Sequence, residues 1–201
     1  MALPKFRMDL KHSTTDEQLA IASLKDKNKF AQLVQRYEQK LSRYIRRLTN
    51  LNTQCVEDVL QEAFIKIYKN LNNFDPTLSF SSWAYRITHN EALNYIRKHK
   101  NKEIAPLETD DKDTVSLIDL LESDTNIEAE VAQKEIAEKI RLVIKKLPKK
   151  YRDVIILYYL EQKDYLEISD ILKKPMGTIA TLLNRAKSKF KTLALKHNIV
   201  T

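Results

Sequence analysis

The sequence predicts an all-α protein made of two helical domains joined by a flexible acidic linker. The chain of 201 residues contains one Gly and five Pro, and long stretches repeat apolar residues three and four positions apart. No window offers the alternating pattern of a β-hairpin. Hydrophobic residues make up 43 %, enough for ordinary cores. We expect domains at 14–101 and 127–196, with the linker at 102–126.

Two helices are predicted at the start of the first domain. The run Thr14-Thr15-Asp16-Glu17 has the Thr-x-x-Glu form of a capping box, which opens a short helix. A longer helix follows from about Asn28 to Leu51, with an apolar stripe on one side and basic residues on the other. Asn52 or Thr53 can cap the next helix.

The third helix of this domain has an acidic outer face and ends in a turn. Apolar residues recur along it, and they leave Asp58, Gln61 and Glu62 outward. In the following segment, 72–77, amide and Asp side chains compete for backbone hydrogen bonds, and Pro76 disfavours helix at the residue before it. The chain must therefore turn here, and a fourth helix is expected to begin near Ser79.

The fourth helix carries a polar stripe suited to nucleic acid. Arg86, Asn90, Asn94 and Arg97 follow at offsets that lie on one narrow face. The Asn side chain presents a hydrogen-bond donor and an acceptor together, and the Arg side chain presents a planar fork of donors. The stripe can therefore read the edges of bases. The nearby aromatic residues can stack on unpaired bases; they are Phe74, Phe80, Trp83 and Tyr85. For Phe80 and Trp83 a place in the core is the alternative interpretation.

The linker lacks periodicity, contains Pro106 and is rich in Asp and Thr, which predicts flexibility. Its apolar run at 117–121 fits either a short docking helix or a turn packed on a neighbouring domain. A helix is expected to return near Ile127 and to stop at Pro148. The next helix, from Lys149 to Gln162, is apolar on all sides over 154–160 and is predicted to be the buried centre of the second domain.

The last part of the chain has the pattern of a helix-turn-helix. Asp164 to Glu167 forms a second capping box, and the run 175–178 with the sole Gly predicts a turn before a final helix from Thr178. Ile179, Leu183, Ala186 and Phe190 should face inward. The residues left to face DNA are Thr178, Ala180, Thr181, Asn184, Arg185, Lys187 and Ser188.

Charge is distributed in three blocks. Residues 1–102 hold 18 Lys and Arg against 10 Asp and Glu, residues 103–130 hold 1 against 10, and residues 131–201 hold 16 against 7. Two basic blocks around an acidic one fit two modules that face nucleic acid. For any single run of charged residues, the alternative explanation is an ordinary helix face exposed to solvent.

Catalytic, metal and membrane functions have no sequence support. Cys55 is the only cysteine, and no Cys/His grouping has the spacing of metal ligands. The four His residues lie far apart, and no phosphate-binding loop or nucleophile motif occurs. No apolar run is long enough for a membrane span, and 1–11 lacks the apolar core of a signal peptide. We expect no cofactor, no metal, no enzymatic activity, no membrane insertion and a cytoplasmic location.

Two groups of motifs resemble the sigma-70 family, in particular its extracytoplasmic-function (ECF) branch. Region 2 is matched by Asp58-Val59-Leu60-Gln61-Glu62-Ala63-Phe64 and Phe80-Ser81-Ser82-Trp83-Ala84-Tyr85-Arg86-Ile87. Region 4 is matched by Leu147-Pro148, Tyr151-Arg152, Tyr165-Leu166-Glu167-Ile168, Pro175-Met176-Gly177-Thr178-Ile179 and Arg185-Ala186-Lys187. The resemblance extends from about Asp16 to Leu195. It departs at Ala180 to Leu182, where the family commonly has basic residues and Ser, and at Asn94, where it often has Asp.

The resemblance implies a role for each motif. The contact with the β′ clamp helices of core RNA polymerase would be made by Asp58, Gln61, Glu62 and Phe64. Recognition and melting of the −10 element, with capture of an unpaired base in the turn, would fall to Phe74, Asp75, Ser79, Phe80, Trp83, Arg86, Asn90, Asn94, Arg97 and Lys98. The final helix would read duplex DNA at −35. The β flap of the polymerase and an anti-sigma protein are further implied partners, and the acidic linker would enter the polymerase channel.

Two other functions are alternatives to this one. A helix-turn-helix regulator acting without polymerase explains 127–195 but leaves the acidic face and aromatic turn at 58–86 unused. A helical nuclease needs clustered carboxylates to bind metal, and here the carboxylates concentrate in the linker instead. Pairing of Asp58 and Glu62 with Lys66 and Lys69 is a structural alternative for the acidic face.

Overall fold

The computed structural model describes residues 14–99 and 139–197, and every regular element in these two ranges is helical. The elements are α1 (Asp16–Ser23), α2 (Lys27–Thr49), α3 (Thr53–Lys69), η1 (Leu71–Asn73), α4 (Phe80–Lys98), α6 (Lys149–Ile155), η3 (Ile156–Leu160), α7 (Tyr165–Leu172) and α8 (Met176–Lys196). A helical segment at 139–146 precedes α6. The all-α prediction is confirmed. The predicted linker, 102–126, and the expected helix start near Ile127 lie outside the described residues.

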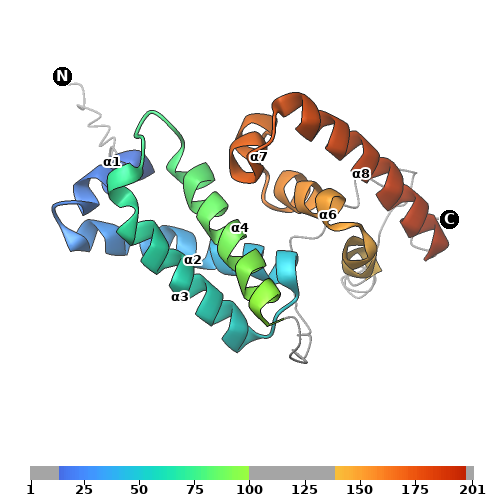
Figure 1. The fold of residues 1–201 in the computed structure, drawn as a ribbon, viewed down its shortest axis with the longest axis horizontal. Helices are drawn as coiled ribbons and strands as arrows, with labels where there is room; N and C mark the ends of the chain where they lie inside the picture. Colours follow the sequence, from blue (N-terminus) through green and yellow to red (C-terminus); the bar gives the residue numbers. More distant parts are fainter. Residues whose placement is uncertain (1–13, 100–138, 198–201) are drawn as a thin grey trace, which may run out of the picture.

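Figure 1 shows two groups of helices that meet along α4. We call α1 to α4 the N-terminal bundle, and 139–146 with α6, η3, α7 and α8 the C-terminal bundle. In the first, α1, α2, α3 and α4 pack on one another; in the second, α8 lies along α6 and against α7. The two bundles touch where α7 packs on α4 and η3 on α2. Their buried apolar side chains form one continuous cluster. In the described ranges, no helix is both long and apolar enough to cross a bilayer.

Side-chain caps fix where the helices of the N-terminal bundle begin. Asn52 accepts a hydrogen bond from the Cys55 amide at 2.9 Å, so Asn52 is the cap of α3. The capping box of α1 is formed by Thr15 and Gln18, one residue later than the predicted pair, at 3.1 and 3.2 Å. Glu17 is thereby freed for a distant contact: its Oε1 accepts from the Phe80 amide at 3.0 Å. This bond ties α1 to the start of α4.

The second capping box is confirmed, but the predicted turn before α8 is not. Asp164 and Glu167 exchange the expected hydrogen bonds at 2.8 and 3.0 Å. The helix α8 begins at Met176 rather than Thr178, so Gly177 lies in its first turn, with open space where a Cβ would stand. The left-handed residue of the turn is Lys173 (φ 51°), which ends α7. The turn therefore does not depend on the glycine.

The buried centre of the C-terminal bundle contains a π-helical turn. The predicted apolar helix runs as α6 and then widens in η3, where the Glu161 amide donates to the Ile156 carbonyl at 3.0 Å. Within the predicted buried run 154–160, Val154 to Leu157 are fully buried, whereas Tyr158 to Leu160 are only partly buried. Gln162 then adopts a left-handed conformation (φ 52°), and the chain turns into α7. Such turns insert one residue into the helical register.

Candidate nucleic-acid interface

An open pocket lies between the α3–α4 turn and the start of α1. Its volume is about 450 Å³. It is lined by Thr15, Glu17, Gln18, Ile21, Pro76, Thr77, Leu78 and Ser79. Two large apolar side chains on its wall are half exposed, Ile21 at 49 % and Leu78 at 51 %. Three of the eight lining residues are apolar, and the other five bring hydrogen-bonding groups. An open hollow of this mixed character can admit a planar ligand such as a nucleobase.

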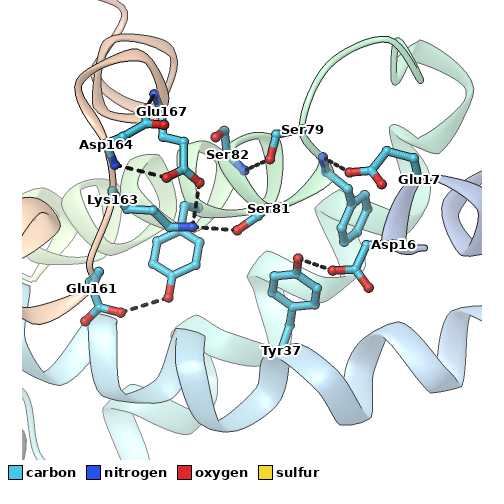
Figure 2. Close-up of polar contacts among 12 residues, drawn as sticks. Asp16, Glu17, Tyr37, Ser79, Ser81, Ser82, Glu161, Lys163, Asp164 and Glu167 are labelled. Atoms are coloured by element: carbon cyan, nitrogen blue, oxygen red, sulfur yellow. Dashed lines mark hydrogen bonds and ion pairs between the residues drawn. The ribbon is translucent and has the colours of Figure 1, made fainter. Parts of the chain in front are cut away.

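Internal hydrogen bonds hold the turn that forms this pocket. Asp75 Oδ1 accepts from the Thr77 amide at 2.9 Å and from the Thr77 hydroxyl at 2.7 Å. These bonds lower the pKa of the Asp75 carboxyl, so it stays ionised at neutral pH. Ser79 caps α4 by accepting from the Ser82 amide at 3.3 Å (Figure 2). Asp75 and Ser79 therefore shape the turn in the structure.

The aromatic residues of the turn form a cluster in the core. The ring centroids of Phe74 and Phe80 are 5.5 Å apart, and those of Phe74 and Trp83 are 5.2 Å apart. Phe80 is 2 % exposed and Trp83 is 7 % exposed. The core covers both rings, so they cannot stack on a base in this placement. Phe80 and Trp83 are core residues, which is the alternative interpretation given for them above. Phe74 is only partly buried and lies at the edge of the cluster.

The polar stripe of α4 is open at its C-terminal half and covered near Arg86. Asn90, Arg97 and Lys98 are exposed. Asn94 is partly buried, and its Nδ2 lies 3.4 Å from Glu91 Oε1 on the same helix. Arg86 is different, because its guanidinium donates to Asp170 Oδ1 on α7 at 2.7 Å.

The acidic face of α3 is exposed as predicted. Asp58, Gln61 and Glu62 all point to solvent. Lys66, the proposed intrahelical partner, pairs instead with Glu91 on α4 at 2.7 Å. Among the described residues, neither Asp58 nor Glu62 takes part in an ion pair. Phe64 is partly buried, with its ring centroid 6.4 Å from that of Phe30.

The buried and exposed faces of α8 follow the predicted pattern. Ile179, Leu183, Ala186 and Phe190 are fully buried. Of the predicted DNA-facing residues, Ala180 and Lys187 are partly buried, and the rest are exposed: Thr178, Thr181, Asn184, Arg185 and Ser188.

Sequence reasoning missed what surrounds Lys187. Its Nζ lies 5.9 Å from the ring centroid of Tyr158 and 5.7 Å from that of Tyr159. A hydrogen bond with Tyr159 raises the pKa of Lys187. The ammonium group is thus held over two rings of η3, where cation–π attraction orients it. The adjacent tyrosines were a visible signal, although only the fold shows that they meet this lysine.

In the two described ranges, no three His, Cys, Asp or Glu side chains gather as metal ligands would. The geometry instead combines an exposed acidic helix, an open pocket at the α3–α4 turn, a polar stripe and a helix-turn-helix. These features define a class of helical transcription factor with more than one nucleic-acid contact.

The comparisons with known proteins agree with this class. Residues 33–102 match the family described as Sigma-70 region 2, and residues 137–190 match Sigma-70, region 4. The chain is 34 % identical to the ECF RNA polymerase sigma factor SigW of Bacillus subtilis (strain 168), over 81 % of this chain and 87 % of the relative. It is 30 % identical to the ECF RNA polymerase sigma-E factor of Escherichia coli (strain K12), over 81 % and 84 %.

Two solved structures share the fold. CnrH, in complex with the cytosolic domain of CnrY, aligns with a TM-score of 0.66 at 21 % identity, over 90 % of this chain and 97 % of CnrH. RpoE of Bartonella quintana, in complex with the anti-sigma factor NepR, aligns with a TM-score of 0.60 at 17 % identity, over 83 % and 96 %. The chain belongs to the ECF sigma factors of the sigma-70 family. It acts with core RNA polymerase in promoter-specific initiation, and a regulator independent of polymerase is not favoured.

Proposed function

We propose that the two bundles divide promoter recognition, with the N-terminal bundle opening the −10 element and the C-terminal bundle reading −35. The observation that carries this division is the pocket at the α3–α4 turn. It lies at the start of α4, the helix that bears the polar stripe. A base extruded from the non-template strand would enter it, and Asn90, Asn94, Arg97 and Lys98 would follow the adjoining strand. Unstacking one base costs about a few kcal/mol, which these contacts would offset.

Core polymerase is proposed to dock on the acidic face of α3. Asp58, Gln61 and Glu62 are exposed on a chain of net charge +8. An unpaired acidic surface suits a basic protein surface rather than a phosphate backbone. Phe64, partly buried beside this face, would contribute apolar contact at its edge.

The −35 contact is proposed to rest on the exposed side chains of α8. Thr181, Asn184 and Arg185 offer donors and acceptors for the major groove, and Lys187 and Ser188 would contact phosphates. Ala180 and Leu182 replace polar residues common in the family, which leaves readout to their neighbours. The protein itself would be non-catalytic and act in the cytoplasm. An anti-sigma partner stays a prediction.

Run-off transcription with core polymerase on a pool of promoters tests the proposal. The wild-type chain should support initiation and select a −10 and a −35 consensus. Asn90→Ala with Asn94→Ala should relax selection at −10 only, whereas Asn184→Ala should relax it at −35 only. Glu38→Ala, an exposed acid on α2, is the control and should change neither. No transcript above core polymerase alone, or an unchanged consensus in both variants, would contradict the proposal.

A further inference from the structure

A carboxylate lies within the polar stripe of α4, the surface proposed to follow the single strand at −10. Glu91 comes directly after Asn90 and three residues before Asn94 on this helix. Its side chain is only 13 % exposed. An acid at this place repels a phosphate backbone unless a cation offsets its charge. The neighbours of Glu91 therefore decide what it contributes to this surface.

Both carboxylate oxygens of Glu91 have a partner. Lys66 Nζ, on the neighbouring helix α3, lies 2.7 Å from Glu91 Oε2. The other oxygen, Oε1, accepts a hydrogen bond from Asn94 Nδ2 at 3.4 Å. The Lys66 side chain is 44 % exposed, so a cation near the surface balances the charge of the more deeply placed carboxylate. Lys66, Glu91 and Asn94 thus form one connected row of polar groups from α3 to the stripe.

The carboxylate of Glu91 decides which end of the Asn94 amide faces outward. A carboxylate only accepts hydrogen bonds, whereas an Asn amide carries a carbonyl acceptor on one side and an NH₂ donor on the other. If the amide were turned over, its oxygen would lie against an oxygen of Glu91, and the two acceptors would repel. The carbonyl oxygen, Oδ1, therefore faces away from Glu91. Among the described residues nothing donates to Asn94 Oδ1, and this atom is not fully buried, so it is available to a ligand.

Asn90 provides a contrast on the same face of α4. It is exposed, and its side-chain amide has no hydrogen bond with any residue in 14–99 or 139–197. This amide can rotate and offer either a donor or an acceptor to a base. Asn94 offers an acceptor only. Two identical side chains, one helical turn apart, thus differ in what they can select.

We propose that Glu91 is a positioning residue for promoter recognition: held by Lys66, it fixes Asn94 with its carbonyl oxygen outward, so that Asn94 selects a −10 base carrying an amino group. This inference rests on the proposed contact of Asn94 with the −10 strand. Adenine, cytosine and guanine each present an exocyclic amino group, whereas thymine presents carbonyl oxygens. The position read by Asn94 should therefore disfavour thymine about fivefold relative to cytosine, which corresponds to the net contribution of one hydrogen bond.

The test measures base preference in the holoenzyme formed by the full-length chain and core polymerase. Single-stranded oligonucleotides, built on the −10 consensus that the run-off pool selects, carry deoxycytidine or deoxyuridine at each position in turn. These two bases have the same size and present an amino group and a carbonyl oxygen, respectively, at the same ring position. Asn94→Ala identifies the position that Asn94 reads, because the preference is lost there. In fluorescence anisotropy, wild type should bind deoxycytidine at this position about fivefold more tightly than deoxyuridine.

Two variants of the row make the result specific. In Glu91→Gln, Lys66 attracts the oxygen of the introduced amide, so its NH₂ group faces Asn94 and the Asn94 amide turns over; the preference for deoxycytidine should disappear or reverse. Lys66→Glu combined with Glu91→Gln inverts the polarity of the pair. The introduced amide then presents its oxygen to Asn94, and the preference for deoxycytidine should return. Glu38→Gln, which removes an exposed acid on α2, is the matched control and should keep the wild-type ratio.

The outcomes separate this positioning role from the proposed function. Far-UV circular dichroism should show the same helix content in every variant. A deoxycytidine to deoxyuridine ratio that is unchanged in Glu91→Gln, even with a general loss of affinity, overturns the positioning role and leaves the −10 contact standing. A wild type that favours deoxyuridine at the Asn94 position overturns it as well. If Asn94→Ala changes the preference at no −10 position, the proposed contact of Asn94 fails, and the role of Glu91 fails with it.

Discussion

Replacing Asp153 with Asn should stabilise the protein near neutral pH and have no effect in acid. The side chain of Asp153, on α6, is buried, and its Oδ1 has no hydrogen-bond partner among the described residues. Burial raises the pKa of its carboxyl from 3.8 to about 6, although Lys149, Arg152 and Lys174 act in the opposite direction. The charged form is thus disfavoured by the fold.

The sign of the effect follows from proton binding. An acid whose pKa is higher in the folded state binds its proton more tightly there, so between 3.8 and about 6 stability falls as the pH rises. The difference corresponds to about 3 kcal/mol, an order-of-magnitude upper bound. Asn cannot ionise, so Asp153→Asn should gain close to nothing near pH 3 and up to about 3 kcal/mol near pH 7.

A neighbouring histidine titrates in the same window with the opposite sign. His89 accepts or donates a hydrogen bond with Tyr44 at 2.7 Å, and its Nε2 lies 3.9 Å from Asp153 Oδ2. Burial, and then Lys149, lower the pKa of His89 to about 4. It is therefore uncharged at neutral pH, so the contact with Asp153 is no ion pair there. Its lowered pKa makes stability fall as the pH drops from 6.5 toward 4.

Wild type should therefore show a nearly flat pH profile from about 4 to 6, and Asp153→Asn a profile that falls in acid. Urea unfolding followed by circular dichroism at a series of pH values measures both. Glu57→Gln, which removes an exposed acid on α3, is the matched control and should track wild type. An Asn variant that is less stable than wild type near pH 7, or equally stabilised at every pH, would refute the reasoning.

Three further changes test other parts of the structure. Phe80→Ala should lower the free energy of unfolding in urea by about 3–5 kcal/mol, because the ring is buried. Phe80→Leu should recover most of that loss and leave promoter opening intact. Loss of promoter opening in a folded Phe80→Leu variant would argue for base stacking. Glu62→Lys should weaken binding to core polymerase about tenfold in a pull-down titration, and equal loss in Glu38→Lys would show a non-specific charge effect. Arg185→Ala should weaken −35 duplex binding and relax sequence preference while leaving the salt slope unchanged, because Arg185 is assigned to a base edge. A salt slope reduced by about 1 with unchanged preference would contradict that assignment and place Arg185 on phosphate.

Sequence periodicity predicted the helices well because burial and capping are local in sequence. The spacing of Ile179, Leu183, Ala186 and Phe190 placed all of them in the core, and the structure agrees. Asp164 and Glu167 cap α7 because both partners lie within one turn. Helix positions that depend on side chains three or four residues apart can be read directly from a pattern.

Contacts between distant segments could not be predicted in this way. Arg47 and Glu161 are separated by most of the chain, and neither stands in a motif that points to the other. The capping box of α1 lies one residue later than predicted, and Glu17, the expected member, bonds the distant Phe80 amide. In each case the contact depends on a partner that is distant in the sequence, and a local pattern does not contain that partner.

The π-helical turn η3 makes chain length, rather than residue identity, a constraint. Deleting one residue from 156–160 would restore α-helical register and rotate everything beyond it by about 100°. The side chain of Glu161 would then point away from Arg47, and the rings of Tyr158 and Tyr159 would leave Lys187. Substitutions in this stretch are therefore easier to tolerate than a single-residue gap, so related chains that conserve this arrangement should keep the number of residues between Pro148 and Asp164.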